Sequence, residues 1–108
     1  MHVQVVTYRI GEVSDEDFIE ANREFAEMMS VVPGLLAKIW LKAPGDGVYG
    51  GVYLWRDEAA YAAFMASELW ASVVSDESLT DLRSQDFETM EELSRATQPG
   101  LAVFGSTA

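Results

Sequence analysis

A chain of 108 residues is long enough for one domain with a single core and too short for two. Its net charge of −11 argues against nucleic acid or an anionic membrane as a partner, because both require clustered Lys and Arg. The absence of Cys excludes disulfides, thiolate metal sites and a Cys nucleophile. No membrane span or signal peptide is evident, so we expect one cytoplasmic domain over residues 1–108, with 98–108 as a loosely held tail.

The first half of the chain predicts a strand, a helix and a hairpin. Val3 to Ile10 alternates and is rich in β-branched residues, which is typical of a strand. Ser14 is a typical helix N-cap followed by acidic residues, and the helix is expected to end at Pro33. Two further strands, 35–42 and 48–56, flank a connection rich in turn residues and predict a β-hairpin.

The second half predicts a helix and a final strand. Asp57 is expected to cap a helix over residues 58–74, which carries its large apolar side chains on one side. Residues 82–91 alternate weakly and predict a fourth, more exposed strand, and 92–97 predict one helical turn. The resulting order is the ferredoxin-like βαββαβ arrangement. It is an α+β fold in which a four-stranded antiparallel sheet carries two helices on one face.

The second face of this sheet is expected to be covered. Apolar residues occupy both alternation phases of the predicted strands, as Val5 and Val6 show in the first strand. An antiparallel sheet with one solvated face should instead alternate cleanly between apolar and polar residues. We therefore predict a homodimer in which two copies pack sheet against sheet.

Large aromatic side chains gather on the two hairpin strands, where they form either core and dimer interface or the wall of a pocket for a flat organic molecule. Alternation places Trp40 and Lys38 on one face of the first hairpin strand, and Tyr53 and Trp55 on one face of the second. The pattern does not tell which face looks at the helices. The Gly50-Gly51 pair inside the second hairpin strand indicates a bulge or close packing against the backbone.

Two polar features suggest a site. Asn22 interrupts the apolar stripe of the first helix, where a buried amide without partners would cost roughly 1–3 kcal/mol. Alternatively, the stripe is offset and Asn22 lies at its solvated edge. Most basic residues fall on or at the ends of strands, where they pair with acids or form a cationic pocket for an acidic substrate. These residues are Arg9, Lys38, Lys42, Arg56 and Arg83.

Two segments carry a resemblance to a known family. PGLLAKIW at 33–40 and GGVYLWRDEAAY at 50–61 resemble the YdhR-like monooxygenases. This family lies in the dimeric α/β-barrel superfamily, together with the antibiotic-biosynthesis monooxygenases, and the resemblance extends over roughly residues 3–97. It implies a ferredoxin-like protomer, a sheet-to-sheet dimer and a cavity between sheet and helices in each protomer.

The chain departs from the wider superfamily in its histidines. Other members often carry His in the second helix, where this chain has Phe64, Glu68 and Leu69. The single His here, His2, is expected at a frayed terminus. We therefore expect no haem ligand, no metal site and no cofactor.

The resemblance implies a cofactor-independent monooxygenase that oxidises a small aromatic or polycyclic phenol-like molecule with O2. Such a site needs walls that hold the ring and exclude water, and a donor or cation that stabilises the substrate anion. The alternatives are a non-catalytic dimeric module that binds a small hydrophobic ligand, and an isomerase on the same scaffold. The catalytic candidates are Asn22, Trp40 and Tyr53, and the substrate-binding candidates are Tyr8, Lys38, Trp55, Phe64 and Arg83.

Overall fold

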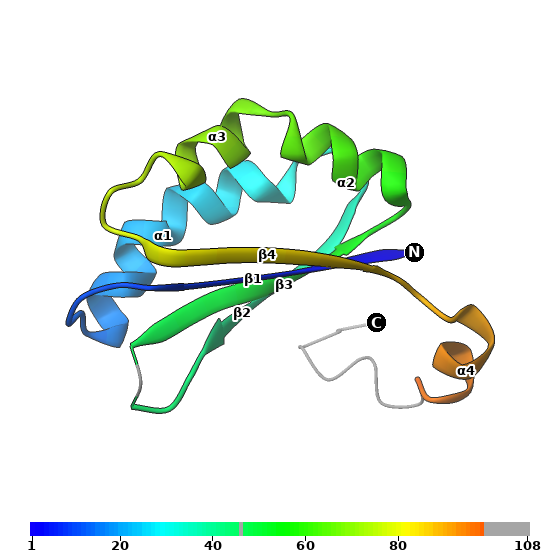
Figure 1. Cartoon of the computed structure of the whole chain (residues 1–108), viewed down its shortest axis with the longest axis horizontal. Helices are drawn as coiled ribbons and strands as arrows, with labels where there is room; N and C mark the ends of the chain where they lie inside the picture. Colours follow the sequence, from blue (N-terminus) through cyan, green and yellow to red (C-terminus); the bar gives the residue numbers. More distant parts are fainter. Residues whose placement is uncertain (46, 99–108) are drawn as a thin grey trace.

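The computed structural model describes residues 1–45 and 47–98, so the predicted C-terminal tail lies almost wholly outside the described residues. Helices and strands alternate along the chain much as the sequence predicts (Figure 1). In chain order they are β1 (His2–Arg9), α1 (Asp15–Ser30), β2 (Leu35–Lys42), β3 (Val48–Trp55), α2 (Glu58–Met65), α3 (Glu68–Val74), β4 (Thr80–Glu88) and α4 (Glu91–Ala96).

The four strands form one antiparallel sheet in the order β2-β3-β1-β4. Helices α1, α2 and α3 all lie on one face of this sheet, whereas α4 follows the end of β4 on the other side (Figure 1). The ferredoxin-like α+β prediction is therefore confirmed. Among the described residues, no helix is long and apolar enough to cross a bilayer.

The second predicted helix is divided into α2 and α3. Ser67 lies between them, where its hydroxyl donates to the carbonyl oxygen of Phe64 at 2.6 Å and accepts from the backbone N–H of Trp70 at 3.3 Å. A Ser that caps a new helix in this way satisfies backbone groups that an uninterrupted helix would satisfy by itself. The apolar periodicity of residues 58–74 runs through the break and so does not reveal it.

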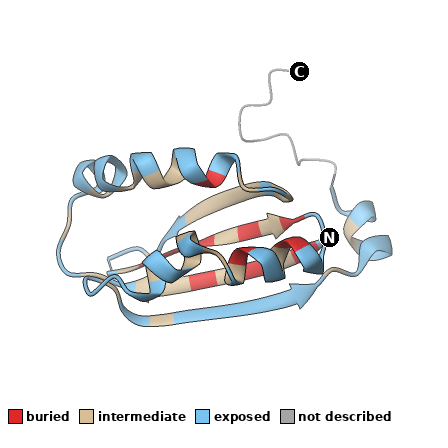
Figure 2. Cartoon of the chain, turned by 90° about the horizontal axis from the view of Figure 1, so that it is seen from above, coloured by how far each residue is buried: buried red, intermediate tan, exposed pale blue. Residues whose placement is uncertain are grey.

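The helix-facing side of the sheet carries the core. In β1 the buried side chains are His2, Gln4 and Val6, which alternate with less buried neighbours. Burial is concentrated in β1, in β3 and on the helix surfaces that face them (Figure 2). The main core cluster consists of Val6, Met29, Tyr53, Trp55, Ala60 and Phe64.

The opposite side, which we call the outer face, carries apolar side chains on β1 and β3. Val5 pairs with Val52 on β3, and directly paired residues share a face of the sheet. Val3 pairs with Phe87 on β4, and the Phe87 side chain is 45% exposed. The outer face of a single chain therefore leaves apolar surface in contact with solvent.

Asp57 begins α2, as the sequence predicts. Its Oδ1 accepts a hydrogen bond from the backbone N–H of Ala60 at 2.9 Å. We expect Asp57→Ala to lower the free energy of unfolding, because one orphan N–H of the helix loses its acceptor. Urea denaturation would measure the loss. Asp57→Asn keeps an acceptor oxygen, so a loss just as large in this variant would contradict the capping role.

Candidate functional site

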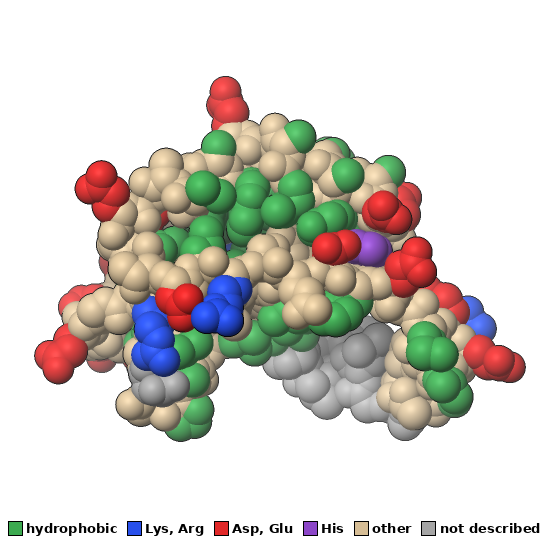
Figure 3. All heavy atoms as spheres, viewed as in Figure 1, with side chains coloured by type: hydrophobic (Ala, Val, Ile, Leu, Met, Phe, Trp, Pro, Cys, Tyr) green, Lys and Arg blue, Asp and Glu red, His purple; other side chains and the backbone are tan. Residues whose placement is uncertain are grey.

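A cavity of about 450 Å3 lies between α1 and the helix-facing side of the sheet. The β1–α1 connection at residues 10–13 and the segment 72–79 before β4 complete its lining. Hydrophobic side chains gather between the helical layer and β4 (Figure 3). We call this cavity the central pocket. A cavity of this size between packed layers is typical of sites for small organic molecules.

Lys38 is the one basic side chain that lines the described central pocket. Its Nζ lies 3.5 Å from the ring centroid of Trp40, 4.7 Å from that of Tyr53 and 5.0 Å from that of Phe25. We call these three rings the aromatic cage. The ion pairs of the described residues do not include Lys38. Because the ammonium is desolvated and has no carboxylate partner, burial lowers the pKa of Lys38 to about 7.

The glycine pair of β3 makes room for this lysine. A Cβ on Gly51 would lie 2.9 Å from Cε of Lys38, so a side chain at this position would displace the lysine stem. A Cβ on Gly50 would lie 2.0 Å from the backbone oxygen of Val6, which shows how closely β1 and β3 approach there. The pair therefore marks close packing against the backbone, one of the two interpretations that the sequence left open.

Two tyrosine hydroxyls are available to a ligand in the central pocket. Burial raises the pKa of Tyr8 to about 12, and the negative charge of Asp76 adds to the shift. Burial also raises the pKa of Tyr53. Both hydroxyls therefore stay protonated at neutral pH and can donate. In the described part of the chain, neither hydroxyl has a hydrogen-bond partner in the protein. Every fully buried side-chain oxygen of the described residues does have such a partner, so neither hydroxyl is fully buried and both are accessible from the pocket.

Asn22 lies at the wall of the central pocket and is partly buried. Its Nδ2 donates to the carbonyl oxygen of Phe18 at 2.9 Å, one turn earlier in α1. Among residues 1–45 and 47–98, its Oδ1 has no hydrogen-bond partner. Asn22, Phe18 and Trp40 also line a second groove of about 390 Å3 between α1 and β2, so they separate two cavities.

The structure brings five of the eight predicted site residues together around the central pocket. They are Tyr8, Asn22, Lys38, Trp40 and Tyr53. It does not bring the other three there. Trp55 and Phe64 are buried in the core, with 0% and 2% exposure, and their rings lie 5.1 Å apart. Arg83 pairs in register with Thr7, lies on the outer face and donates to Asp81 at 3.2 Å.

Some pocket residues were not predicted from the sequence. Phe25 forms one side of the aromatic cage, and Phe18 stacks on Tyr49 with ring centroids 4.5 Å apart. Both lie on the same helical stripe as Asn22, at i, i+4 and i+7, so the spacing already placed them on one surface. Gly51 was noted but not connected with Lys38.

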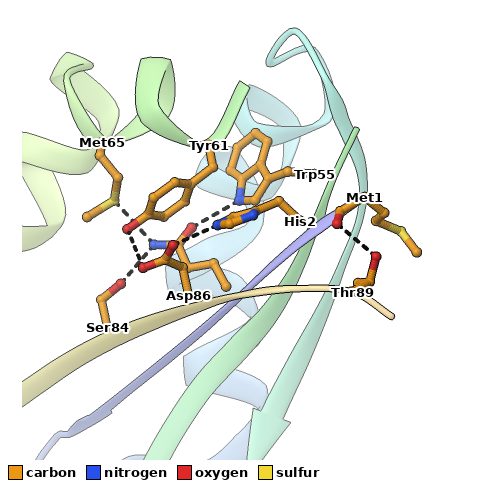
Figure 4. Close-up of polar contacts among 9 residues, drawn as sticks. Met1, His2, Trp55, Tyr61, Met65, Ser84, Asp86 and Thr89 are labelled. Atoms are coloured by element: carbon orange, nitrogen blue, oxygen red, sulfur yellow. Dashed lines mark hydrogen bonds and ion pairs between the residues drawn. The ribbon is translucent and has the colours of Figure 1, made fainter. Parts of the chain in front are cut away.

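The expectation that His2 lies at a frayed terminus is wrong. His2 is 4% exposed, because β1 runs between β3 and β4 and its first residue is paired on both sides. Its Nε2 lies 2.6 Å from Oδ2 of Asp86, whose Oδ1 accepts from the Tyr61 hydroxyl at 3.2 Å (Figure 4). The hydrogen bond with His2 holds the pKa of Asp86 below its usual range. His2 therefore belongs to a structural polar cluster and does not line the central pocket.

Gln4 forms hydrogen bonds with two further polar side chains beside this cluster. It is fully buried; its Oε1 accepts from Nε1 of Trp55 at 3.1 Å, and its Nε2 donates to Oγ of Ser84 at 2.9 Å (Figure 4). The indole N–H of Trp55 is thus used inside the core. A buried group with its partner already made is not free to bind a ligand.

The low pKa of Lys38 predicts a pH-dependent effect on stability. Below about pH 7 the folded protein holds a charged, desolvated ammonium, and this cost disappears above the ordinary lysine pKa of 10.5, where both states are neutral. We expect Lys38→Met to raise the free energy of unfolding most at or below neutral pH, with a gain that shrinks as the pH rises. Urea denaturation as a function of pH would measure it.

Lys42→Met is the matched control, because Lys42 is exposed and its ammonium contacts Asp15 at 2.8 Å. This hydrogen bond raises the pKa of Lys42, so its removal should give no such gain. An equal, pH-independent effect of the two substitutions would contradict the burial of a nearly neutral amine at Lys38.

Comparison with family models decides where the chain belongs. The model described as "Putative mono-oxygenase ydhR" matches residues 4–99. The chain belongs to the ydhR mono-oxygenase family. The match covers the central pocket, the aromatic cage and all four strands except the first residues of β1. Among the curated proteins, none matches the chain.

Solved structures share the fold of this ydhR family member. A "putative antibiotic biosynthesis monooxygenase" from Deinococcus radiodurans is 15% identical, with 84% of this chain and 94% of that chain covered and a TM-score of 0.70. SnoaB from Streptomyces nogalater, a cofactor-independent oxygenase solved as a mutant, is 16% identical, with 85% and 96% covered and a TM-score of 0.64. The haem-degrader MhuD from Mycobacterium tuberculosis, solved with two haems in its active site, is 17% identical, with 83% and 96% covered and a TM-score of 0.65.

Proposed function

We propose that this ydhR family member is a cofactor-independent monooxygenase that oxidises a small aromatic or polycyclic phenol-like substrate with O2. The observation that carries the proposal is the aromatic cage around Lys38 in a cavity large enough for a small flat molecule. The cofactor-independent oxygenase SnoaB shares this fold and supports the choice of chemistry.

The pocket supplies what such a reaction asks of a protein. The rings of Trp40 and Tyr53 would hold a flat substrate and exclude water, which strengthens every electrostatic interaction inside the site. Lys38 and the Tyr8 and Tyr53 hydroxyls would stabilise the negative charge on the substrate oxygen. The unpartnered Oδ1 of Asn22 would orient a substrate hydroxyl.

The electrons come from the substrate in this proposal. The substrate loses one ring C–H and its hydroxyl O–H, that ring carbon becomes a carbonyl, and O2 is the oxidant. One oxygen atom enters the product, and the other leaves as water with the two hydrogens. The chain's own part is to bind the ring, stabilise its anion and keep solvent away from the intermediate.

Haem, which the MhuD neighbour contains, does not fit the residues of this pocket. The described side chains that line the central pocket include no His, Cys or Met. The single His of the chain, His2, is engaged by Asp86 in the polar cluster. Within the described residues no group of three His, Cys, Asp or Glu side chains could hold a metal ion. We therefore derive no step through haem or a metal.

Oxygen consumption tests the proposal. We expect the purified protein, treated with a chelator and given no cofactor, to consume O2 with anthrone-like or quinol substrates faster than buffer alone. Labelled O2 should place one labelled atom in the product. No consumption above the buffer rate with any member of the panel would favour the non-catalytic ligand-binding module.

We also propose a homodimer that packs outer face to outer face, because apolar side chains of this surface stay partly exposed in one chain. Sedimentation should give twice the mass of a single chain.

Phe87→Glu should shift the protein toward the monomer, because it places a charge in the apolar interface. Val74→Glu introduces the same charge at an exposed apolar residue on α3, away from the outer face, and should leave the dimer intact. A wild-type monomer at micromolar concentration would contradict the dimer. The cytoplasmic location and the single-domain organisation stay predictions.

A further inference from the structure

We propose that Nζ of Lys38 is the base that takes the proton from a phenol or enol hydroxyl bound in the central pocket, so that the substrate class is a small, flat, acidic phenol or enol. This inference rests on the proposed function, because it assigns the proton transfer that precedes the reaction with O2. It goes further by giving Lys38 a catalytic role and by limiting the substrates to those that ionise readily.

The geometry leaves Lys38 as the one suitable base among the described lining residues. The other titratable groups that line the pocket are Tyr8 on β1, Tyr53 on β3, Glu12 in the β1–α1 connection and Asp76 before β4. The two tyrosines are protonated at neutral pH. Glu12 and Asp76 are exposed carboxylates, and an exposed carboxylate is too weak a base to deprotonate a phenol. No titratable group on α1 lines this pocket.

The surroundings of Lys38 favour a neutral amine before the substrate binds and an ammonium afterwards. Before binding, the ammonium is desolvated and has no carboxylate partner among the described residues, and its pKa of about 7 lets much of it lose its proton at neutral pH. After the transfer, the substrate oxyanion becomes the missing counter-ion. The face of Trp40, 3.5 Å from Nζ, stabilises the new cation.

The step balances without an oxidant. The O–H bond of the substrate breaks, the proton forms a new N–H bond on Lys38, and the electron pair stays on the substrate oxygen. A base whose pKa lies near the operating pH takes a proton readily only from a hydroxyl that ionises near or below that pH. Phenols and enols that ionise near neutral pH are therefore preferred to ordinary phenols, and phenol ethers are excluded.

Gly51 is the positioning residue for this base. A Cβ at this position would lie 2.9 Å from Cε of Lys38, which is the far end of a flexible side chain, and 3.3 Å from the backbone oxygen of Ile39, which must shift by only a few tenths of an ångström. Gly51→Ala should therefore fold normally but displace Nζ from the aromatic cage. A residue with a purely structural role would change stability and leave the ionisation of a bound ligand unaltered.

The probe for the test is 7-hydroxycoumarin, a flat phenol that ionises near neutral pH and whose neutral and anionic forms have separate absorption bands. The experiment is run at a pH midway between the pKa of Lys38 and that of the probe. Absorption reports the ionisation state of the bound probe. Calorimetry in two buffers with different ionisation enthalpies reports how many protons are exchanged with the solvent. The wild-type protein should bind the anion with almost no net proton exchange, because the phenol proton stays on Lys38.

Three variants distinguish between Lys38 as a base that accepts the proton and Lys38 as a fixed positive charge that only attracts the anion. Lys38→Met should bind the probe in its neutral form. Lys38→Arg should bind the anion but release protons to the buffer, because a guanidinium cannot accept one. Gly51→Ala should lose most of the anion band while its far-ultraviolet circular dichroism and urea midpoint stay close to those of the wild type.

Several outcomes would overturn the proposal. They are a neutral probe bound to the wild type, a wild-type proton release equal to that of Lys38→Arg, and preferential or equal binding of 7-methoxycoumarin, which cannot ionise. Failure of both coumarins to bind would overturn it as well, because the pocket would not accept flat acidic phenols. None of these readouts depends on O2. Ionisation of the probe without oxygen consumption by any substrate would uphold the base and refute the oxygenase.

Discussion

Trp40→Ala should reduce kcat/KM for the oxygenase reaction by roughly 100-fold or more, because the substrate ring loses the surface that fixes its orientation. Trp40 contacts three other residues of the proposed site. Its ring lies 3.5 Å from Nζ of Lys38 and makes edge contacts with Phe18 and Phe25 at centroid distances of 6.2 and 6.5 Å. Its removal would also join the central pocket to the groove between α1 and β2, since it lines both. Steady-state oxygen consumption measures the effect.

Trp40→Phe is the matched control for this prediction. It keeps a flat ring over the pocket and should retain a larger share of the activity than the alanine variant. Sedimentation should give both variants the same mass as the wild type, because Trp40 lies on the helix-facing side of β2. Equal activity in Trp40→Ala and the wild type would contradict the assignment of the central pocket as the reaction site.

Trp55→Ala should lower the free energy of unfolding by about 3–5 kcal/mol, since it empties a large volume at the centre of the core. Trp55 is 0% exposed and stacks on Tyr53 with ring centroids 6.1 Å apart. Its indole N–H also donates to the buried Gln4. Urea denaturation at a fixed protein concentration measures the loss.

Trp55→Phe separates packing from hydrogen bonding at this position. It keeps much of the ring volume but leaves the Oε1 atom of Gln4 without its donor, so a loss of roughly 1–3 kcal/mol is expected. If Trp55→Ala were stable but failed to bind ligands, Trp55 would be a pocket residue, and its placement in the core would be wrong.

The fold was predictable because each local signal agreed with the global arrangement. The alternation of Val3 to Ile10, the cap at Ser14 and the turn residues after Lys42 each define an element by themselves. The division of the second helix at Ser67 was not predictable, because the apolar pattern on both sides is continuous. The cap depends on a hydroxyl that can equally remain in an unbroken helix.

The site could be predicted only in part. Alternation tells which face of the strand a side chain lies on, but not whether that side chain borders a cavity or is enclosed in the core. Tyr53 and Trp55 share a face, yet Tyr53 borders the cavity, whereas Trp55 is enclosed by Phe64 and Gln4. Neighbours distant in the sequence decide between these two environments. The alternation within one strand carries no information about these distant neighbours.

Arg83 and His2 illustrate two further limits of the sequence. A shift of one residue along β4 separates Arg83, on the outer face, from Ser84, which bonds to Gln4 on the helix-facing side. The weak alternation of β4 does not fix that register. His2 looks like a terminal residue, but it is held by Asp86, 84 residues away in the chain. Such a contact exists only once the sheet has formed.

The titration of Lys38 tests the central claim most directly, namely that a desolvated, unpaired amine lies in the aromatic cage of the central pocket. The chain contains two lysines, Lys38 and Lys42, so an NMR titration of protein labelled with 13C at lysine Cε gives two resonances, and Lys38→Met assigns them. We predict a midpoint at about 7 for Lys38. Lys42, paired with Asp15, should titrate above its ordinary range. A Lys38 midpoint near the ordinary 10.5 would contradict the account, because it would place the amine in water.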